Sequence, residues 1–245
     1  MVSAAVMAGS MAAPSVYAED GPHTFSANVA MVSDYRFRGM SQNDETIAIQ
    51  GGFDYAHDSG FYAGTWASSL DWQDGAAGSD DTTIEVDLYA GFGGDIGDSG
   101  FGYDVGVLRY MYPNAASGTD YDTTEVYGSL SYSYFTASLA YSNELNFLGA
   151  DDSTYFNLAG DYEFDNGVGI GASWGTFDID EKRGQADLDY DDWKIYVAYT
   201  TPEKFGGFDL ELAYIDTDED GVCDNSAGPF QCDSTAVFSI SKSWE

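Results

Sequence analysis

The sequence predicts an all-β protein, a transmembrane antiparallel up-and-down β-barrel of about twelve strands. Three observations lead to this prediction. Apolar and polar residues alternate at every second position along most of the chain, as they do in a strand with two unlike faces. Short turns and longer acidic loops alternate between these segments. The stretches between successive turns and loops, strand ends included, are roughly ten or more residues long, which is the length that a tilted strand needs to cross a bilayer.

The composition excludes two classes of protein. The 245 residues include 42 Asp+Glu but only 8 Lys+Arg, so the net charge is -34 and no basic surface is available to bind nucleic acid. A disordered acidic chain would be poor in aromatic residues, whereas this one has 19 Tyr, 15 Phe and 5 Trp. The length suits a single domain, because large all-β barrels fold as one unit.

Residues 1–18 differ from the rest of the chain because they carry no charge and are rich in Ala, Met, Val and Ser. They end in Val16-Tyr17-Ala18 before Glu19, which suits cleavage by signal peptidase, and the apolar run is too short for a spanning helix. We therefore expect residues 1–18 to be a signal peptide, truncated because the usual basic opening segment is missing. We expect residues 19–245 to form a single outer-membrane β-barrel domain.

The alternation defines the strands one after another. The first strand carries apolar residues from Phe25 to Phe37 on one face and Arg36 and Arg38 on the other, whereas the third strand is less regular. Residues 126–143 are uncharged, but their period of two indicates two strands and a tight turn rather than a membrane helix. The predicted apolar faces run from Phe25 to Phe37, Ile47 to Tyr55, Tyr62 to Trp72, Ile84 to Phe92, Phe101 to Val107, Val126 to Tyr132, Phe135 to Tyr141, Phe156 to Tyr162, Val168 to Trp174, Trp193 to Tyr199, Phe208 to Tyr214 and Phe238 to Trp244.

The joins between the predicted strands have two kinds of length and composition. The short or turn-rich joins are 57–60, 94–100, the turn near Ser133, 165–167 and 201–207. The longer, acidic joins are 71–81, 113–121, 178–190 and 216–233. Bacterial outer-membrane barrels have short periplasmic turns, longer outer loops and both termini in the periplasm.

A soluble lipocalin or β-sandwich would also alternate, with its apolar face inward. The strand lengths and a polar face built from Gly, Ser, Asn, Asp and Glu favour the membrane barrel with a wet lumen. Tyr, Phe and Trp at the ends of many apolar faces match the aromatic girdles of such barrels.

Six segments carry a resemblance to a known family: FSANVAMVSDYRFRGMSQ (25–42), IQGGFDYAHDSGFYAGTWAS (49–68), DLYAGF (87–92), YDVGVLRYMYP (103–113), DWKIYVAY (192–199) and SISKSWE (239–245). In this order, from the first strand to the last, they resemble the TorF family of proteobacterial porins. Glu245 is a departure, because such chains usually end at the aromatic residue, here Trp244, that serves as the assembly signal. The resemblance implies an outer-membrane barrel that passes small solutes and that interacts with the barrel assembly machinery through its C-terminal strand. The family name suggests trimethylamine N-oxide respiration, an association that fixes no substrate.

If apolar faces contact lipid, the alternate positions face the lumen. Acidic residues outnumber basic ones at these positions, which favours cations over anions. The alternative is that these charges pair with one another and plug a narrow bore. Arg109 falls on an outward face, where it would reach lipopolysaccharide phosphates unless a bulge turns it inward. Four glycines leave one inward face nearly bare, which either widens the bore or seats a folded loop: Gly167, Gly169, Gly171 and Gly175. The candidate pore-lining residues are Arg36, Arg38, Glu85, Asp87, Asp104, Glu125, Lys194 and Glu211.

The last long loop contains the two cysteines, Cys223 and Cys232, which we expect to form a disulfide in an oxidising envelope. The same loop has carboxylates at alternate positions, a spacing that suits Ca²⁺. The competing interpretation is an ordinary solvated acidic loop, since Ala227 stands where a final acidic ligand would complete the shell. The candidate calcium ligands are Asp216, Asp218, Asp220, the Val222 carbonyl and Asp224.

The two histidines argue against an enzyme. Outer-membrane phospholipases, deacylases and proteases need a catalytic His at the outer leaflet or surface, but His23 and His57 both fall at the predicted periplasmic end. The sequence therefore predicts a non-enzymatic channel for passive diffusion of small solutes that prefers cations and requires no cofactor. The alternative is a structural or adhesive barrel with a plugged lumen, whose acidic loops bind divalent cations and lipopolysaccharide.

Overall fold

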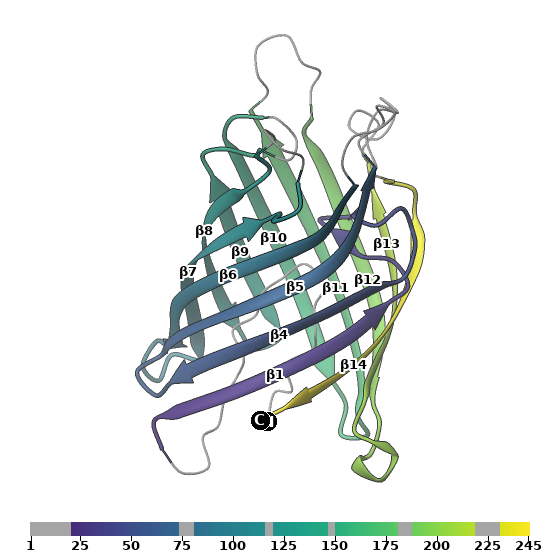
Figure 1. The fold of residues 1–245 in the computed structure, drawn as a ribbon. Coiled ribbons are helices and arrows are strands. Elements are labelled where there is room, and N and C mark those ends of the chain that lie inside the picture. Colours follow the sequence, from purple (N-terminus) through teal and green to yellow (C-terminus); the bar gives the residue numbers. More distant parts are fainter. Residues whose placement is uncertain (1–20, 74–80, 116–119, 147–149, 181–187, 219–230) are drawn as a thin grey trace.

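Each strand of the barrel pairs antiparallel with the next, and β1 pairs with β14 to close the ring (Figure 1). The computed structural model describes residues 21–73, 81–115, 120–146, 150–180, 188–218 and 231–245. The closed order of twelve strands confirms the predicted fold class. Closure also satisfies the backbone groups that an open sheet would leave unpaired in a membrane.

The strand bounds follow the predicted alternation closely over most of the chain. The barrel strands are β1 (His23–Val32), β4 (Ala48–His57), β5 (Phe61–Gln73), β6 (Asp81–Asp95), β7 (Phe101–Met111), β8 (Thr123–Tyr132), β9 (Phe135–Ser142), β10 (Ser153–Glu163), β11 (Val168–Ile179), β12 (Tyr190–Thr200), β13 (Asp209–Thr217) and β14 (Thr235–Trp244). Two short strands, β2 (Arg36–Phe37) and β3 (Met40–Ser41), pair only with each other, and one 3₁₀ turn, η1 (Glu203–Phe205), joins β12 to β13. No helix among the described residues is long and apolar enough to cross a membrane.

The two ends of the barrel differ. At one end, called here the turn end, β8 and β9 are joined by Ser133 and Tyr134 alone. His23 pairs with His57, and Ala27 with Trp244, so β1 begins and β14 finishes near the turn end. The opposite end carries the longer joins and is called the loop end (Figure 1). The predicted signal peptide, residues 1–18, lies outside the described residues.

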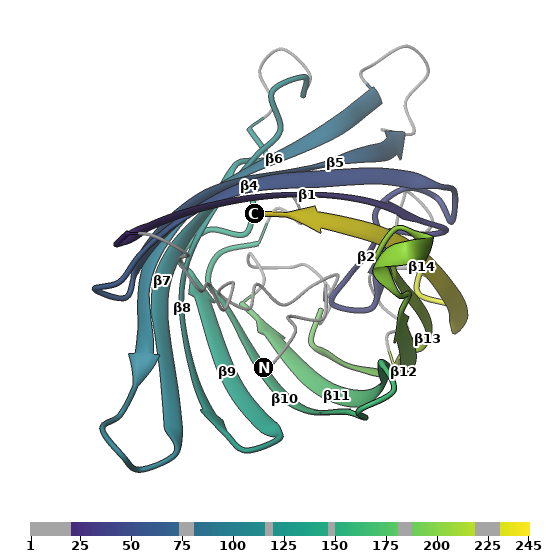
Figure 2. The same cartoon turned by 90° about the horizontal axis from the view of Figure 1, so that it is seen from below.

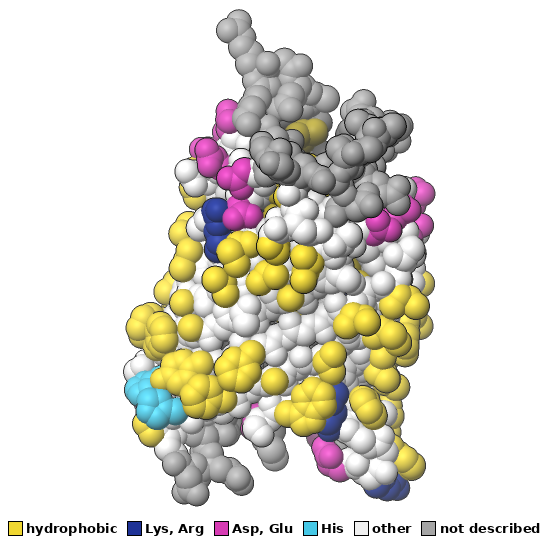
Figure 3. Space-filling view, viewed as in Figure 1, with side chains coloured by type: hydrophobic (Ala, Val, Ile, Leu, Met, Phe, Trp, Pro, Cys, Tyr) yellow, Lys and Arg dark blue, Asp and Glu magenta, His cyan; other side chains and the backbone are white. Residues whose placement is uncertain are grey.

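The outward faces of the strands form an apolar belt. Large side chains on these faces are exposed: Leu88 is 50% exposed, Val105 52% and Leu130 54%. Figure 3 shows apolar side chains gathered over the middle and lower part of the wall, with acidic side chains nearer the loop end. An exposed apolar belt around a closed sheet is the surface that lipid covers in outer-membrane barrels.

The inward wall is built partly from tyrosines that lie over glycines of neighbouring strands. A Cβ at Gly64 would stand 2.6 Å from the Tyr89 ring, and a Cβ at Gly171 would overlap Tyr196 and Asp161. The face of β11 that was expected to be bare is therefore filled by neighbouring side chains. Gly169 is the exception on this face, because its nearest neighbour would be the Ala198 Cβ at 3.6 Å.

The prediction that the first strand continues to Phe37 is wrong, because β1 ends at Val32. Residues 33–47, called here the inward loop, leave the wall, and residues 34–43 of this loop are buried inside the barrel, as Figure 2 shows for the part containing β2. Tyr35 and Phe37 are consequently buried in the lumen instead of facing lipid. Period-two alternation persists beyond the end of β1, so the pattern alone does not mark where the chain turns inward.

The predicted lipid face of the third strand is also wrong. On β5, Tyr62, Leu70 and Trp72 are buried inside the barrel. Leu70 and Trp72 belong to an aromatic cluster that includes Tyr35 of the inward loop and Tyr110 of β7. Leu70 and Trp72 therefore pack against the inward loop instead of facing lipid. This packing gives the loop end of the lumen a buried apolar interior.

Candidate functional site in the barrel lumen

The charged residues predicted to line a pore are divided between the wall and the inward loop. Arg36 and Arg38 lie on the inward loop, where they are 2% and 7% exposed. The others lie on inward faces of the wall: Glu85 and Asp87 on β6, Asp104 on β7, Glu125 on β8, Lys194 on β12 and Glu211 on β13. The structure thus brings the arginines and the wall carboxylates into one interior.

Arg38 joins the inward loop to the wall. Its Nη2 donates to both carboxylate oxygens of Glu125, at 2.8 and 2.9 Å. Its guanidinium carbon lies 4.3 Å from the ring centre of Tyr155 and 4.4 Å from that of Phe177, within the range of cation–π attraction. Burial alone lowers the pKa of Arg38, but Glu125 and the nearby tyrosines outweigh burial and raise it. The guanidinium therefore carries its full charge beside Glu125.

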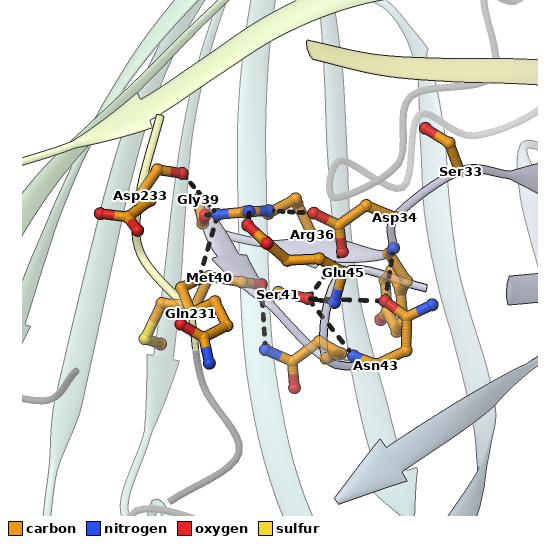
Figure 4. A network of polar contacts seen from close by, with 12 residues as sticks. Ser33, Asp34, Arg36, Gly39, Met40, Ser41, Asn43, Glu45, Gln231 and Asp233 are labelled. Atoms are coloured by element: carbon orange, nitrogen blue, oxygen red, sulfur yellow. Dashed lines mark hydrogen bonds and ion pairs between the residues drawn. The ribbon is translucent and has the colours of Figure 1, made fainter. Parts of the chain in front are cut away.

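Arg36 is held by the inward loop and by the last outer join together (Figure 4). Its Nε donates to Asp34 at 2.5 Å and its Nη2 to Glu45 at 2.9 Å. Its Nη1 donates to three backbone carbonyls, those of Gly39 at 3.0 Å, Gln231 at 3.0 Å and Asp233 at 3.1 Å. A buried guanidinium needs such a complete set of acceptors, because an unsatisfied charge inside a protein is costly.

Tyr35 anchors the beginning of the inward loop. Its hydroxyl lies 3.3 and 3.4 Å from the two carboxylate oxygens of Glu85. Its ring packs edge-on against Trp66, with ring centres 5.5 Å apart. Burial, with the nearby carboxylates of Glu85 and Asp87, raises the pKa of the Tyr35 hydroxyl well above its usual range, so the hydroxyl remains a hydrogen-bond donor.

The inward loop crosses the bore. Tyr35 reaches β6, Arg38 reaches β8, β10 and β11, and Gly39 lies against β12 and β13, where an added Cβ would overlap Thr217 and come within 3.0 Å of the Asp192 Cβ. The inward loop therefore contacts six strands of the wall toward the loop end. A cavity of about 20 Å³ remains beside Arg36, Lys194 and Glu211, which is room for roughly one water molecule.

Tyrosine hydroxyls donate to carboxylates farther toward the turn end. Tyr62 donates to Asp104 at 2.8 Å and also lies 2.5 Å from the Tyr127 hydroxyl. Tyr89 donates to Asp54 in the same way. On another part of the wall, Tyr196 donates to Asp161. These pairs come from β4 to β8 and from β10 and β12. Tyr62 is buried, and the other side chains are only partly buried.

The lumen carries more carboxylates than cations. Lys194 pairs with Glu211 at 2.6 Å, and the two arginines have the partners already described. Within the described ranges, no Lys, Arg or His lies at ion-pair distance from several lumen carboxylates, and Asp87 and Asp104 each keep one buried oxygen without a hydrogen-bond partner. These carboxylates are Asp54, Glu85, Asp87, Asp104, Asp161 and Asp192. An excess of fixed negative charge in a bore attracts cations.

The candidate calcium site is mostly outside the described residues, which include Asp216 and Asp218 but not Asp220, Val222 or Asp224. Asp216 accepts a hydrogen bond from the Tyr214 hydroxyl at 3.3 Å, and Asp218 accepts one from the Asp191 backbone N–H at 2.6 Å. Among the described residues, no group of three or more His, Cys, Asp or Glu is placed to hold a metal ion. The calcium site therefore stays a prediction.

Cys232 is buried and disulfide-bonded, whereas Cys223 lies outside the described residues, so its pairing stays a prediction.

Arg109 and the histidines lie where the sequence placed them. Arg109 faces outward and pairs with Asp122 at 3.0 Å, and Thr124 accepts a second hydrogen bond at 2.9 Å. No bulge turns it inward, because β7 and β8 pair without interruption there. His23 and His57 face each other across β1 and β4 at the turn end, with ring centres 5.1 Å apart.

Sequence reasoning missed the inward tyrosines and the carboxylates of Asp54, Asp161 and Asp192. A usable signal existed for Tyr62, because Phe61 and Tyr62 are adjacent and only one of them can face lipid. The short turn between β4 and β5 sets the register so that Phe61 faces outward. No comparable signal marks the inward loop, since its contacts join residues from distant parts of the sequence.

Two solved structures show what this fold is similar to. A structure named "KdgM porin" has a TM-score of 0.51 at 7% identity, and the match covers 90% of this chain and 98% of that chain. A structure titled "Unveiling the Mechanism Behind the in-meso Crystallization of Membrane Proteins" has a TM-score of 0.50 at 9% identity, with 90% of this chain and 83% of that chain covered. At these identities the likeness shows the fold, a porin-like barrel.

Comparison with curated proteins gives no match. The resemblance to the TorF family is not confirmed by the comparisons. A family model described as "Bacterial protein of unknown function (Gcw_chp)" matches residues 17–244, from before the first strand to the end of the last. The chain therefore belongs to the Gcw_chp family.

Proposed function

We propose that the protein is a porin-like channel of the bacterial outer membrane, through which small solutes diffuse passively and which prefers cations. The observation that carries the proposal is a closed barrel with an apolar outer belt around a polar interior whose carboxylates exceed its cations. The channel is non-enzymatic and needs no cofactor. The resemblance to TorF porins agrees with the proposal but adds no substrate.

The channel is narrow for two reasons. Barrel diameter grows with strand number, so twelve strands enclose less space than the sixteen of a general porin. The inward loop then takes up part of that space toward the loop end. We therefore expect passage only of small solutes.

Negative charge in the lumen gives the channel its preference for cations. Asp54 and Asp104 are partly buried, accept hydrogen bonds from tyrosines and have no cation partner among the described residues. In a bore with low-dielectric walls, such fixed charges raise the local concentration of cations. Arg36, Arg38 and Lys194 do not offset this effect, because each is already paired with a carboxylate.

The reversal potential across a planar bilayer in a KCl gradient tests the preference. We expect cation selectivity in the wild type and a lower K⁺ to Cl⁻ permeability ratio in the double variant Asp54→Asn, Asp104→Asn. The matched control is Asp152→Asn, Asp180→Asn, which removes the same charge from the loop-end joins near the outward Tyr141 and should leave the ratio unchanged. Anion selectivity in the wild type would refute the cation preference.

The packing of the inward loop favours a second candidate, a structural barrel with a plugged lumen. Met40 of the inward loop is 0% exposed, and so is Ala48 of β4, which lies in one buried cluster with Tyr35 and Phe37 of the loop, as in the core of a soluble protein. In this candidate, the acidic loops, including the predicted calcium ligands, bind divalent cations and lipopolysaccharide. Both candidates assign recognition by the assembly machinery to β14. A plugged barrel would show no discrete current steps in salt.

A further inference from the structure

We propose that the segment Gln231 to Asp233 of the last outer join holds the inward loop in its closed position through Arg36, so that changes in this join control the bore. We call these contacts the Arg36 clamp. The inference rests on the proposed channel function and adds a means of regulating it. Arg36 is a positioning residue here, since it acts by placing the inward loop.

The clamp joins two parts of the sequence that are far apart. Nη1 of Arg36 donates to Gly39 of its own loop and to the carbonyls of Gln231 and Asp233 (Figure 4). The Ser41 backbone N–H donates to the same Gln231 carbonyl at 2.9 Å. A single short segment of the last join therefore supplies acceptors to both strands of the β2–β3 hairpin.

Apolar packing strengthens the same connection. Met40 on β3 and Cys232 belong to one buried cluster, together with Phe177 of the wall. Thr217 at the end of β13 donates to the Cys232 carbonyl at 3.4 Å. Because Gln231 and Asp233 flank Cys232, any displacement of this residue moves both carbonyls that Arg36 holds.

Cys232 is also a covalent constraint, since it is disulfide-bonded. A dithiol reductant breaks this bond by transferring two electrons and two protons, which leaves two protein thiols and an oxidised, cyclic disulfide of the reductant. The freed Cys232 no longer fixes the neighbouring carbonyls. The chain has only 2 cysteines, so reduction acts on no other bond.

The other anchors of the inward loop do not depend on the clamp. Arg38 remains paired with Glu125, and Tyr35 remains beside Glu85. Loss of the clamp therefore loosens the side of the hairpin that lies against β12 to β14 and leaves the barrel wall intact. We expect the bore to open intermittently on that side.

The test compares single-channel recordings of the wild type, of Arg36→Lys and of the wild type treated with dithiothreitol. Lys keeps the charge beside Asp34 but cannot reproduce the forked contacts of a guanidinium. We expect each change to raise the fraction of time open by about tenfold or more, because contacts to a charged donor are lost from the closed state alone. The matched control is Arg109→Lys, the same substitution at an outward ion pair, with an unchanged open fraction.

Two reference measurements separate the possible failures. Heat-modifiable migration on gels verifies that each variant forms a barrel. If Arg36→Lys does not fold, the open fraction of the wild type treated with dithiothreitol tests the clamp alone. The second measurement is the conductance of a chain in which a short turn replaces residues 34–46, because this chain has the same barrel without the inward loop. If this chain conducts while both clamp changes leave the open fraction unchanged, the clamp is refuted and the channel stands. If this chain is silent, the proposed channel is refuted together with its regulation.

Discussion

At the scale of single residues, Gly39 shows how closely the inward loop fits the wall. Its φ of +85° lies in the left-handed region that glycine adopts without steric cost. Its missing side chain also leaves room for Thr217 and Asp192, which an added Cβ would displace. Backbone conformation and space therefore both require glycine at the tip of the hairpin.

Gly39→Ala should displace the inward loop and leave the barrel folded. Backbone strain alone costs about 1–2 kcal/mol, and the overlap with Thr217 adds to it. Limited trypsin digestion measures the displacement, because cleavage after Arg36 and Arg38 requires the buried loop to become accessible. Gly97→Ala is the control, since Gly97 also has a positive φ, +55°, but no neighbour within 4 Å of an added Cβ. Equal protection of Arg36 and Arg38 in both variants would contradict the fit described here.

The residues also show how far the sequence predicts the site. Alternation correctly places Glu85, Glu125 and Lys194 on inward faces, because the period of a strand determines its sides. Alternation also puts Arg36 and Arg38 inside the barrel, but on the wall, whereas they lie on a hairpin that folds away from it. Glu125 lies 87 residues from Arg38 in the sequence, and Asp233 lies 197 residues from Arg36. No local sequence pattern predicts contacts over such separations.

At the scale of the strand, the inward face of β11 is shaped by what lies over its glycines. Tyr196 of β12 and Asp161 of β10 meet above Gly171, and Tyr155 and Asp192 meet above Gly175. The rings thereby cover the backbone of the middle strand. The same arrangement recurs where Tyr89 lies over Gly64. Small residues in these strands are therefore needed for packing between neighbouring strands.

Gly171→Ala should destabilise the barrel by about 1–3 kcal/mol, because the new methyl group overlaps the Tyr196 ring and Asp161. Gly169→Ala, on the same face of the same strand, should change stability by less than about 0.5 kcal/mol, since the methyl group would find ordinary contacts. Urea unfolding in detergent micelles compares the two variants. Equal urea midpoints for the two variants would show that the packing of Tyr196 does not require a glycine at position 171.

At the scale of the whole molecule, the lumen has two unlike halves. The loop-end half is packed around the inward loop like a protein core, whereas tyrosine–carboxylate pairs line the wall toward the turn end. Periodicity predicts the barrel and its polarity. It does not predict this division, which arises when one outer join folds back and recruits aromatic residues of β5 and β7.

Single-channel current recording on the wild type and on the chain with residues 34–46 replaced by a short turn tests the central claim most directly. The account predicts small and rare steps in the wild type, with larger and more frequent steps in the shortened chain, because the same water-filled barrel then lacks its inward loop. The absence of steps from both chains, each verified as a folded barrel, would contradict it.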